Sequence, residues 1–424
     1  MRVVVLNPAN PQMNAITAAL ARAGALHVCI FPFRTGGALG RFGPRTPWLG
    51  RRLAADLDRR RVLADVPDRL LVQPAVGWEV ARALADRARR SGAPIPAELH
   101  RRIIERRNRR MGRAARAYLR EADVVLASET MALDAFEEAR RLGVLCVLEA
   151  ATAHHRFSAR TLSEEARLHP EFAATLEPIR PPQRQAQRRD REIEMADVVL
   201  APSRFVAESY LEHGTSAERI VRASYGVDSS RFTPGDDSDR AAPFGVLFVG
   251  GIGQRKGVSY LLDAYRAFRK ADTELILVGA PIGGPRPLAP YRGLFRHVPF
   301  LPHWEMPAVF RSASVLVVSS PIEGLPLVAL EAMAAGLPVV ATPCGADEAV
   351  RDGVDGFVVP FRDPAAISDR LERLYRSAEL RRRMGEAARR RALEFTWERY
   401  GDEVVRILDG RLAAWKARGG SGTR

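Results

Sequence analysis

The sequence has little cysteine and no long apolar run. Its three cysteines, Cys29, Cys146 and Cys344, lie far apart and form no CxxC pair. This scatter excludes a disulfide framework and a zinc-finger pattern, and favours free thiols in a reducing cytoplasm. The longest apolar run, at 325–342, is interrupted by a glutamate, a glycine and a proline. We therefore predict no membrane span.

A secretory signal and nucleic-acid-binding motifs are also missing. Met1 and Arg2 lead directly into a strand-like run, so we expect no secretory signal and a cytoplasmic location. The net charge of +15 is carried almost wholly by arginine. Nucleic acid, an anionic membrane surface and a phosphorylated substrate could each explain that charge. No zinc-finger, RRM, KH or helix-turn-helix pattern accompanies it, so we expect no nucleic-acid partner.

The length of the chain, 424 residues, is too great for one core and predicts two domains. Short runs that are apolar on both faces alternate with helical segments, which is typical of α/β proteins with parallel sheets. A turn-rich, polar stretch after residue 226 divides the chain into 1–226 and 227–396. We expect strands at 3–6, 27–31, 70–73, 123–127, 145–148, 197–201, 220–223, 245–249, 274–278, 298–301, 314–318, 338–341 and 356–359.

Arginine is concentrated in the first domain. Residues 34–69, rich in glycine, proline and arginine, predict a large irregular loop or helical excursion. Residues 97–120 predict a helix with one apolar face. This is either a solvated surface helix or a basic amphipathic helix lying on an anionic membrane surface. Seven of its nine arginines cover much of the remaining surface: Arg101, Arg102, Arg106, Arg109, Arg110, Arg113 and Arg120.

The most informative stretch follows the expected strand at 314–318. A short loop carries Glu323 and Gly324. A helix then begins with Pro326 in its first turn, where a missing N–H costs nothing. Gly336 stands just past the end of that helix, at the position that glycine usually takes.

Glu331 is the one polar residue between 327 and 335. A helix that is apolar all round is normally buried, so an unpaired carboxylate there would be costly. No cation lies close to Glu331 in the sequence. Either this side chain reaches solvent or a distant arginine, or it is held for the hydroxyl groups of a ligand, with Glu323 facing the same ligand.

The loop at 250–257 contains Gly251, Arg255 and Lys256 between a strand and a helix. Its glycine spacing, G-x-G-x-x-x-G, differs from the dinucleotide fingerprint, and no acidic residue ends the next strand, so we do not expect a nicotinamide enzyme. Cations at a helix N-terminus oppose the helix dipole. Arg255 and Lys256 suit an anion such as a phosphate; the alternative is a solvated pair.

Glu323 and Glu331, followed by Ala-Met-Ala, resemble the signature of retaining glycosyltransferase family 4, a nucleotide-sugar-dependent group with the GT-B fold. That fold has two Rossmann-like, doubly wound domains facing each other across a cleft. The stretch at 226–234 is similar to the family's linker, and the likeness runs from about residue 123 to the end. The resemblance implies that 397–424 form a helix crossing back to the first domain, followed by a flexible tail.

The resemblance also implies an activity and a set of site residues. It predicts a metal-independent, retaining enzyme that needs no cofactor and uses a nucleotide-diphosphate sugar as donor. The acceptor would be a glycan or lipid-linked molecule, used in cell-envelope or exopolysaccharide synthesis on the inner face of the membrane. Glu331 would bind the ribose, Lys256 and Arg255 the diphosphate, and Glu323, His154 and the backbone of Gly324, Leu325 and Leu327 the sugar. His154, Glu323 and Lys256 would be the catalytic residues.

Two departures from the family pattern keep rival functions open. Gly251 stands where the family commonly has an arginine that contacts the diphosphate, and Arg255 is a candidate to replace it. The loop after the first strand lacks the family's glycine pair. The alternatives are a nucleotide-sugar epimerase with the same fold and a catalytically weak subunit that binds a partner transferase.

Overall fold

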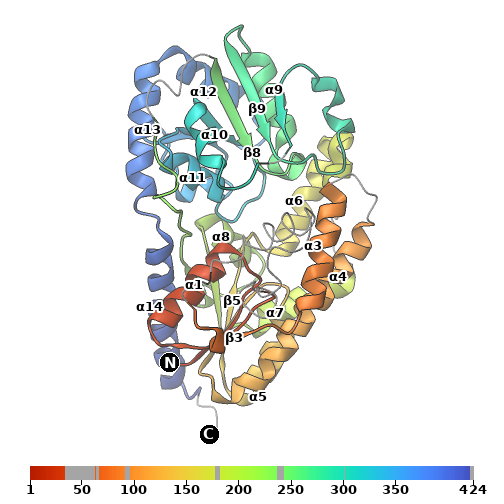
Figure 1. Ribbon diagram of the computed structural model, residues 1–424, viewed down its shortest axis with the longest axis vertical. Coiled ribbons are helices and arrows are strands. Elements are labelled where there is room, and N and C mark those ends of the chain that lie inside the picture. The colour runs from red at the N-terminus through yellow and green to blue at the C-terminus, as the bar shows by residue number, and fades with distance from the viewer. Residues whose placement is uncertain are drawn as a thin grey trace, which may run out of the picture.

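The computed structural model describes residues 1–33, 63, 66–90, 96–176, 182–235, 243–299 and 301–420. The chain forms two α/β domains, one above the other in Figure 1. Most of the predicted loop at 34–69 lies outside the described residues, as do residues 421–424 of the predicted tail. No helix in the described part of the chain is long and apolar enough to cross a membrane.

The first domain is built on a seven-stranded parallel sheet with the order β3-β2-β1-β4-β5-β6-β7. Its central strands are buried on both faces because helices cover each side of the sheet, which explains their continuous apolar runs. The strands are β1 (Val3–Leu6), β2 (Leu26–Ile30), β3 (Leu71–Val72), β4 (Val124–Ser128), β5 (Leu145–Glu149), β6 (Val198–Ala201) and β7 (Ile220–Arg222).

The second domain contains a six-stranded parallel sheet with the order β10-β9-β8-β11-β12-β13. All the predicted strands occur, with ends shifted by a few residues, and the prediction of two Rossmann-like domains is confirmed. The strands are β8 (Phe244–Val249), β9 (Thr273–Val278), β10 (Arg296–Val298), β11 (Val315–Val318), β12 (Val339–Ala341) and β13 (Gly356–Val358).

The order of the second sheet reverses between β8 and β11. The chain passes from β8 outward to β9 and β10, then returns to β11 on the other side of β8. In open α/β sheets, ligands bind at the carboxyl ends of the strands beside such a reversal. The loops that follow β8 and β11 are therefore where a ligand is expected in this domain.

Helices cover both sheets and connect the two domains (Figure 1). The last helix, α14, packs along α1, and Lys416 near its end bonds to Asp123 at 3.0 Å, so α14 returns to the first domain. The helices are α1 (Pro11–Arg22), α3 (Val76–Arg90), α4 (Ala97–Ala115), α5 (Leu133–Leu142), α6 (His155–Leu168), α7 (Gln183–Met195), α8 (Arg204–Glu212), α9 (Val258–Phe268), α10 (Met306–Ser312), α11 (Leu327–Ala334), α12 (Pro364–Arg376), α13 (Ala378–Ala392) and α14 (Trp397–Ala417).

Candidate functional site

The loops after β8 and β11 are fastened to each other by Ser319. Its hydroxyl donates to the carbonyl oxygens of Lys256 and Gly257, at 3.0 and 2.9 Å. Gly257 has a φ of +65°, and a Cβ atom there would lie 1.9 Å from the carbonyl oxygen of Ser319. Only glycine fits that position without displacing the backbone. The two loops are thereby held side by side at the carboxyl ends of neighbouring strands.

Lys256 and Glu323 form an ion pair across these two loops. The Nζ of Lys256 bonds to Oε1 of Glu323, and the two side chains are only 25% and 9% exposed. A partly buried pair is screened less by solvent than a surface pair. The structure therefore brings together two of the three predicted catalytic residues, which lie 67 positions apart in the sequence.

Gly324 lies against the first domain. A Cβ atom on Gly324 would be 2.0 Å from the carbonyl oxygen of Ala151, which belongs to the loop after β5. The hydroxyl of Ser203, after β6, donates to the carbonyl oxygen of Gly324 at 2.6 Å. The loop that carries Glu323 is thus enclosed by loops from the carboxyl ends of strands in both sheets.

Glu331 is paired with a histidine from another part of the second domain. Its Oε1 lies 3.0 Å from Nε2 of His303, whose Nδ1 lies 3.0 Å from Nη1 of Arg231. Its side chain is 17% exposed, so Glu331 is partly buried, and its partner among the described residues is a histidine and not an arginine. The helix has only two turns, and Glu331 lies on its less buried side. Sequence reasoning missed His303, although it follows β10 closely, where ligand-binding residues are common.

The helix that carries Glu331 ends as predicted. The N–H of Gly336 bonds to the carbonyl oxygen of Met333, and that of Leu337 to the carbonyl oxygen of Ala332. With the positive φ of Gly336, these bonds form a Schellman motif. Pro326 lies one position earlier than predicted, because it caps the helix and does not enter the first turn.

Arg255 and Lys256 lie in a short 3₁₀ turn, Gln254–Lys256, before α9 begins. They therefore directly precede the helix at whose start the sequence placed them. Arg255 is exposed, and its side chain forms no ion pair with the described residues. A Cβ atom on Gly251 would lie 3.1 Å from Ile282, so a larger residue there would have to displace that side chain.

The remaining predicted donor residues follow Gly324. Leu325 is buried in the core, whereas Leu327, at the start of α11, is only partly buried. Both lie on the segment that joins the Glu323 loop to the helix of Glu331. Their role in binding a sugar stays a prediction.

His154 is held by contacts within the first domain. It caps α6, with its Nδ1 accepting the backbone N–H of Arg156 at 3.2 Å, and its ring stacks between His155 and His213. The centroid distances in that stack are 4.7 and 4.5 Å. In the described part of the chain, no contact joins His154 to Lys256 or to its partner carboxylate. The predicted contact between His154 and the donor sugar gains no support from this placement.

Burial, together with the neighbouring His155 and His213, lowers the pKa of His154 to about 3. In the unfolded chain the group titrates at its ordinary value of about 6.5. Because the folded-state pKa is the lower one, the neutral ring stabilises the fold above pH 6.5, and this stabilisation is lost as the pH falls. We expect the free energy of unfolding to decrease from pH 7 to pH 5, and His154→Gln to reduce that decrease.

Urea unfolding curves at several pH values would measure this effect. If the free energy of unfolding of His154→Gln depends on pH as steeply as that of the parent, the lowered pKa of His154 is contradicted.

One group of side chains among the described residues has the arrangement of a metal site. Ligand atoms of His154, His155 and Asp190 all lie within 4.8 Å of one another. The carboxylate of Asp190 already accepts two bonds from the guanidinium of Arg156, at 2.7 and 3.1 Å, and one from His155 at 2.9 Å. A bound cation would have to displace a guanidinium. These contacts are better explained as hydrogen bonds and ion pairs that hold the start of α6 in place.

Glu149, at the carboxyl end of β5, is a buried carboxylate that sequence reasoning did not single out. It accepts bonds from the hydroxyls of Ser128 and Tyr225, both at 2.7 Å, and from the amide of Gln12 at 3.4 Å. Burial raises its pKa despite these donors. Glu149 thus connects the first turn of α1 with the segment that joins the domains.

Comparison with known proteins identifies the second domain. A family model described as "Glycosyl transferases group 1" matches residues 243–377, which include both loops of the site. Two relatives are described as D-inositol 3-phosphate glycosyltransferases. The relative from Salinispora arenicola is 34% identical over 255 residues, which is 51% of this chain and 57% of the relative. The relative from Geodermatophilus obscurus is 38% identical over 235 residues, 50% and 52% respectively. The chain thus spans about half the length of the curated relatives it matches.

Solved structures match nearly the whole chain. Sucrose-phosphate synthase from Thermosynechococcus elongatus has a TM-score of 0.67 at 18% identity, covering 98% of this chain and 100% of that one. HepE from Anabaena, in complex with UDP, has a TM-score of 0.64 at 15% identity, covering 97% and 100%. At these identities the likeness concerns the fold alone.

Proposed function

This chain contains a glycosyl transferases group 1 domain within a GT-B fold, as the sequence predicted, and on that premise we propose that it transfers a sugar from a nucleotide-diphosphate sugar to an acceptor hydroxyl. The observation that carries the proposal is the Lys256–Glu323 pair, held at the carboxyl ends of β8 and β11. It places a cation and a carboxylate where the order of the strands reverses. Structural neighbours solved with UDP and with UDP-glucose support a nucleotide sugar as the donor class.

Within this proposal each residue of the site binds a different part of the donor. Lys256 binds the diphosphate and stabilises its charge as it leaves, with Arg255 free to add a second cation. Glu331 binds the ribose hydroxyls, and Glu323 with the backbone of the next residues binds the sugar. The transfer is retaining and needs no metal, so catalysis rests on positioning and on stabilisation of the leaving group. The acceptor is a glycan or lipid-linked molecule of the cell envelope or an exopolysaccharide.

Incubation with a panel of sugar nucleotides tests this function against its two rivals. A transferase without its acceptor is expected to hydrolyse its donor slowly and release the nucleoside diphosphate. An epimerase would return an altered sugar nucleotide. A partner-binding subunit would bind none of the panel, and that result would overturn the proposal.

A further inference from the structure

A hollow of about 550 Å³ lies between α3 and α4 in the first domain. Four arginines of α4 line it together with Trp78 and Pro74: Arg106, Arg109, Arg110 and Arg113. These positions have the i, i+3, i+4 and i+7 spacing that brings side chains to one face of a helix. Like charges at this spacing repel one another, so the arrangement calls for a compensating anion.

The described residues supply little of that compensation. In the described part of the chain, neither Arg106 nor Arg110 has a carboxylate partner; Arg106 lies over the ring of Trp78, 5.4 Å from its centroid, and Arg110 bonds to the carbonyl oxygen of Pro74. The nearest carboxylate to Arg109 is Glu105, at 3.9 Å. The hollow thus contains more positive charge than the described residues around it neutralise.

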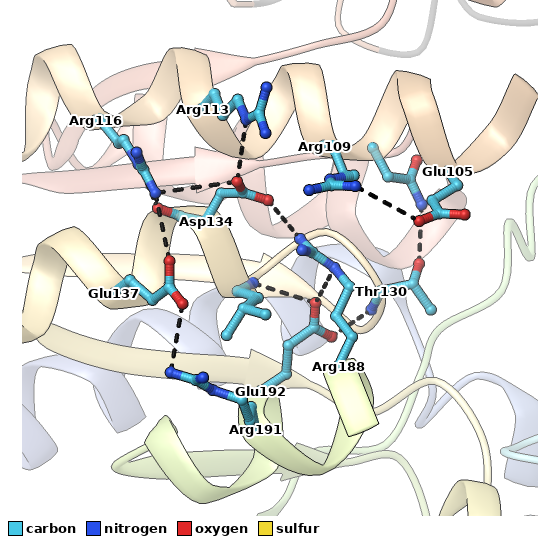
Figure 2. A network of polar contacts seen from close by, with 12 residues as sticks. Glu105, Arg109, Arg113, Arg116, Thr130, Asp134, Glu137, Arg188, Arg191 and Glu192 are labelled. Carbon is cyan, nitrogen blue, oxygen red and sulfur yellow. Dashed lines mark hydrogen bonds and ion pairs between the residues drawn. The ribbon is translucent and has the colours of Figure 1, made fainter. Parts of the chain in front are cut away.

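Arg113 has a carboxylate partner, but a shared one. Its Nε bonds to Asp134 at 3.2 Å, and Asp134 also accepts a bond from Arg188 at 2.6 Å and lies 4.0 Å from Arg116 (Figure 2). One carboxylate therefore meets three guanidinium groups. Arg107, on the inner face of the same helix, is in contrast buried and bonded to Glu79 at 2.9 Å.

The side chains of the hollow are suited to phosphate. Guanidinium groups present several N–H donors in a fixed plane, which match the oxygens of a phosphate better than a single ammonium does. The stacking of Arg106 on Trp78 and the bond from Arg110 to Pro74 fix two of these groups in place before a ligand arrives. We propose that this hollow binds a phosphate-bearing ligand, independently of the donor site at Lys256.

Titration calorimetry with inorganic pyrophosphate tests the proposal. The double substitution Arg106→Gln and Arg110→Gln removes the two guanidiniums without a carboxylate partner, and should weaken binding about tenfold or more. The matched control is Arg383→Gln with Arg390→Gln on α13, two exposed arginines for which no ion pair is found among the described residues. It makes the same change in net charge and should bind like the parent.

Lys256→Ala separates the hollow from the donor site. The parent and Lys256→Ala should both bind pyrophosphate at the hollow, with an affinity that falls as salt is added. Binding that is lost in Lys256→Ala and kept in the double variant would overturn the proposal, as would the absence of pyrophosphate binding to the parent. Circular dichroism of each variant checks that the fold is intact.

Vesicles distinguish a lipid phosphate from a free one. If the ligand is a lipid head group, vesicles containing phosphatidylglycerol should sediment the parent and the control but not the double variant, and pyrophosphate should release the protein. If the ligand is a free phosphate, pyrophosphate binds and the vesicles do not. Sedimentation with vesicles that pyrophosphate does not affect would indicate a diffuse surface attraction and contradict a built site.

Discussion

Replacing Lys256 with alanine is expected to lower kcat by about ten- to a hundredfold, because one charge-assisted contact is worth about 1.5–3 kcal/mol. Negative charge on the departing diphosphate grows toward the transition state, so the contact contributes more there than in the bound donor. The affinity for the donor, measured by calorimetry, should change less than the rate. A kcat close to that of the parent would contradict the role of Lys256.

The ion pair with Glu323 complicates that substitution. Lys256→Ala leaves a carboxylate that is only 9% exposed without its partner, so part of the loss could come from the stranded charge. The double variant Lys256→Ala with Glu323→Gln removes that charge as well. We expect no recovery of kcat, because the contact to the diphosphate remains absent. Recovery of kcat would mean that the loss in Lys256→Ala comes from the unpaired carboxylate of Glu323 and not from the missing contact to the diphosphate.

Two single substitutions complete this set. Lys270 lies in the same domain and bonds to Glu372 at 3.2 Å, so Lys270→Ala is a matched control that should keep parental kinetics. Arg255→Ala should lower kcat as much as Lys256→Ala if Arg255 replaces the arginine missing at Gly251. A near-parental Arg255→Ala enzyme would mean that Lys256 and backbone amides alone hold the diphosphate.

The two glutamates are expected to respond differently to the same isosteric change. The ribose does not react, so its contact with Glu331 should be nearly equal in the ground and transition states. Glu331→Gln should therefore raise KM for the donor about tenfold, the value of one charge-assisted hydrogen bond, with a smaller change in kcat. Glutamine keeps an acceptor for His303, which limits any effect on the fold.

Glu323 should show the opposite pattern. The sugar ring gains positive charge on the way to the transition state, so a nearby carboxylate stabilises that state more than the bound donor. Glu323→Gln should lower kcat about tenfold or more while donor affinity changes little. If Glu331→Gln loses kcat with full affinity and Glu323→Gln loses affinity with full kcat, the two roles are assigned the wrong way round.

The sequence predicted the fold well because local patterns determine it. Short runs that are apolar on both faces and alternate with helical segments are typical of parallel strands covered on each side, and Gly336 marked the end of α11 correctly. The likeness at Glu323 and Glu331 also pointed to the loops that the structure places at the reversal of the second sheet.

The contacts of the site could not be predicted, because they join distant segments. Glu331 is paired with His303, 28 residues away, and Lys256 with Glu323, 67 residues away. The place of β5 in the sheet predicts that the loop after it lies near the site. It does not predict the direction in which the side chains of that loop point. Ala151 meets Gly324, whereas His154 turns toward α8.

Hydrogen–deuterium exchange with and without a nucleoside diphosphate tests the central claim most directly, because it maps binding onto the chain. UDP is the first probe, followed by GDP and ADP. Our account predicts that the nucleotide that binds will slow exchange at 250–258 and 319–331. Slowed exchange confined to the first domain, or no change in the two loops when calorimetry shows binding, would contradict a donor site at Lys256 and Glu323.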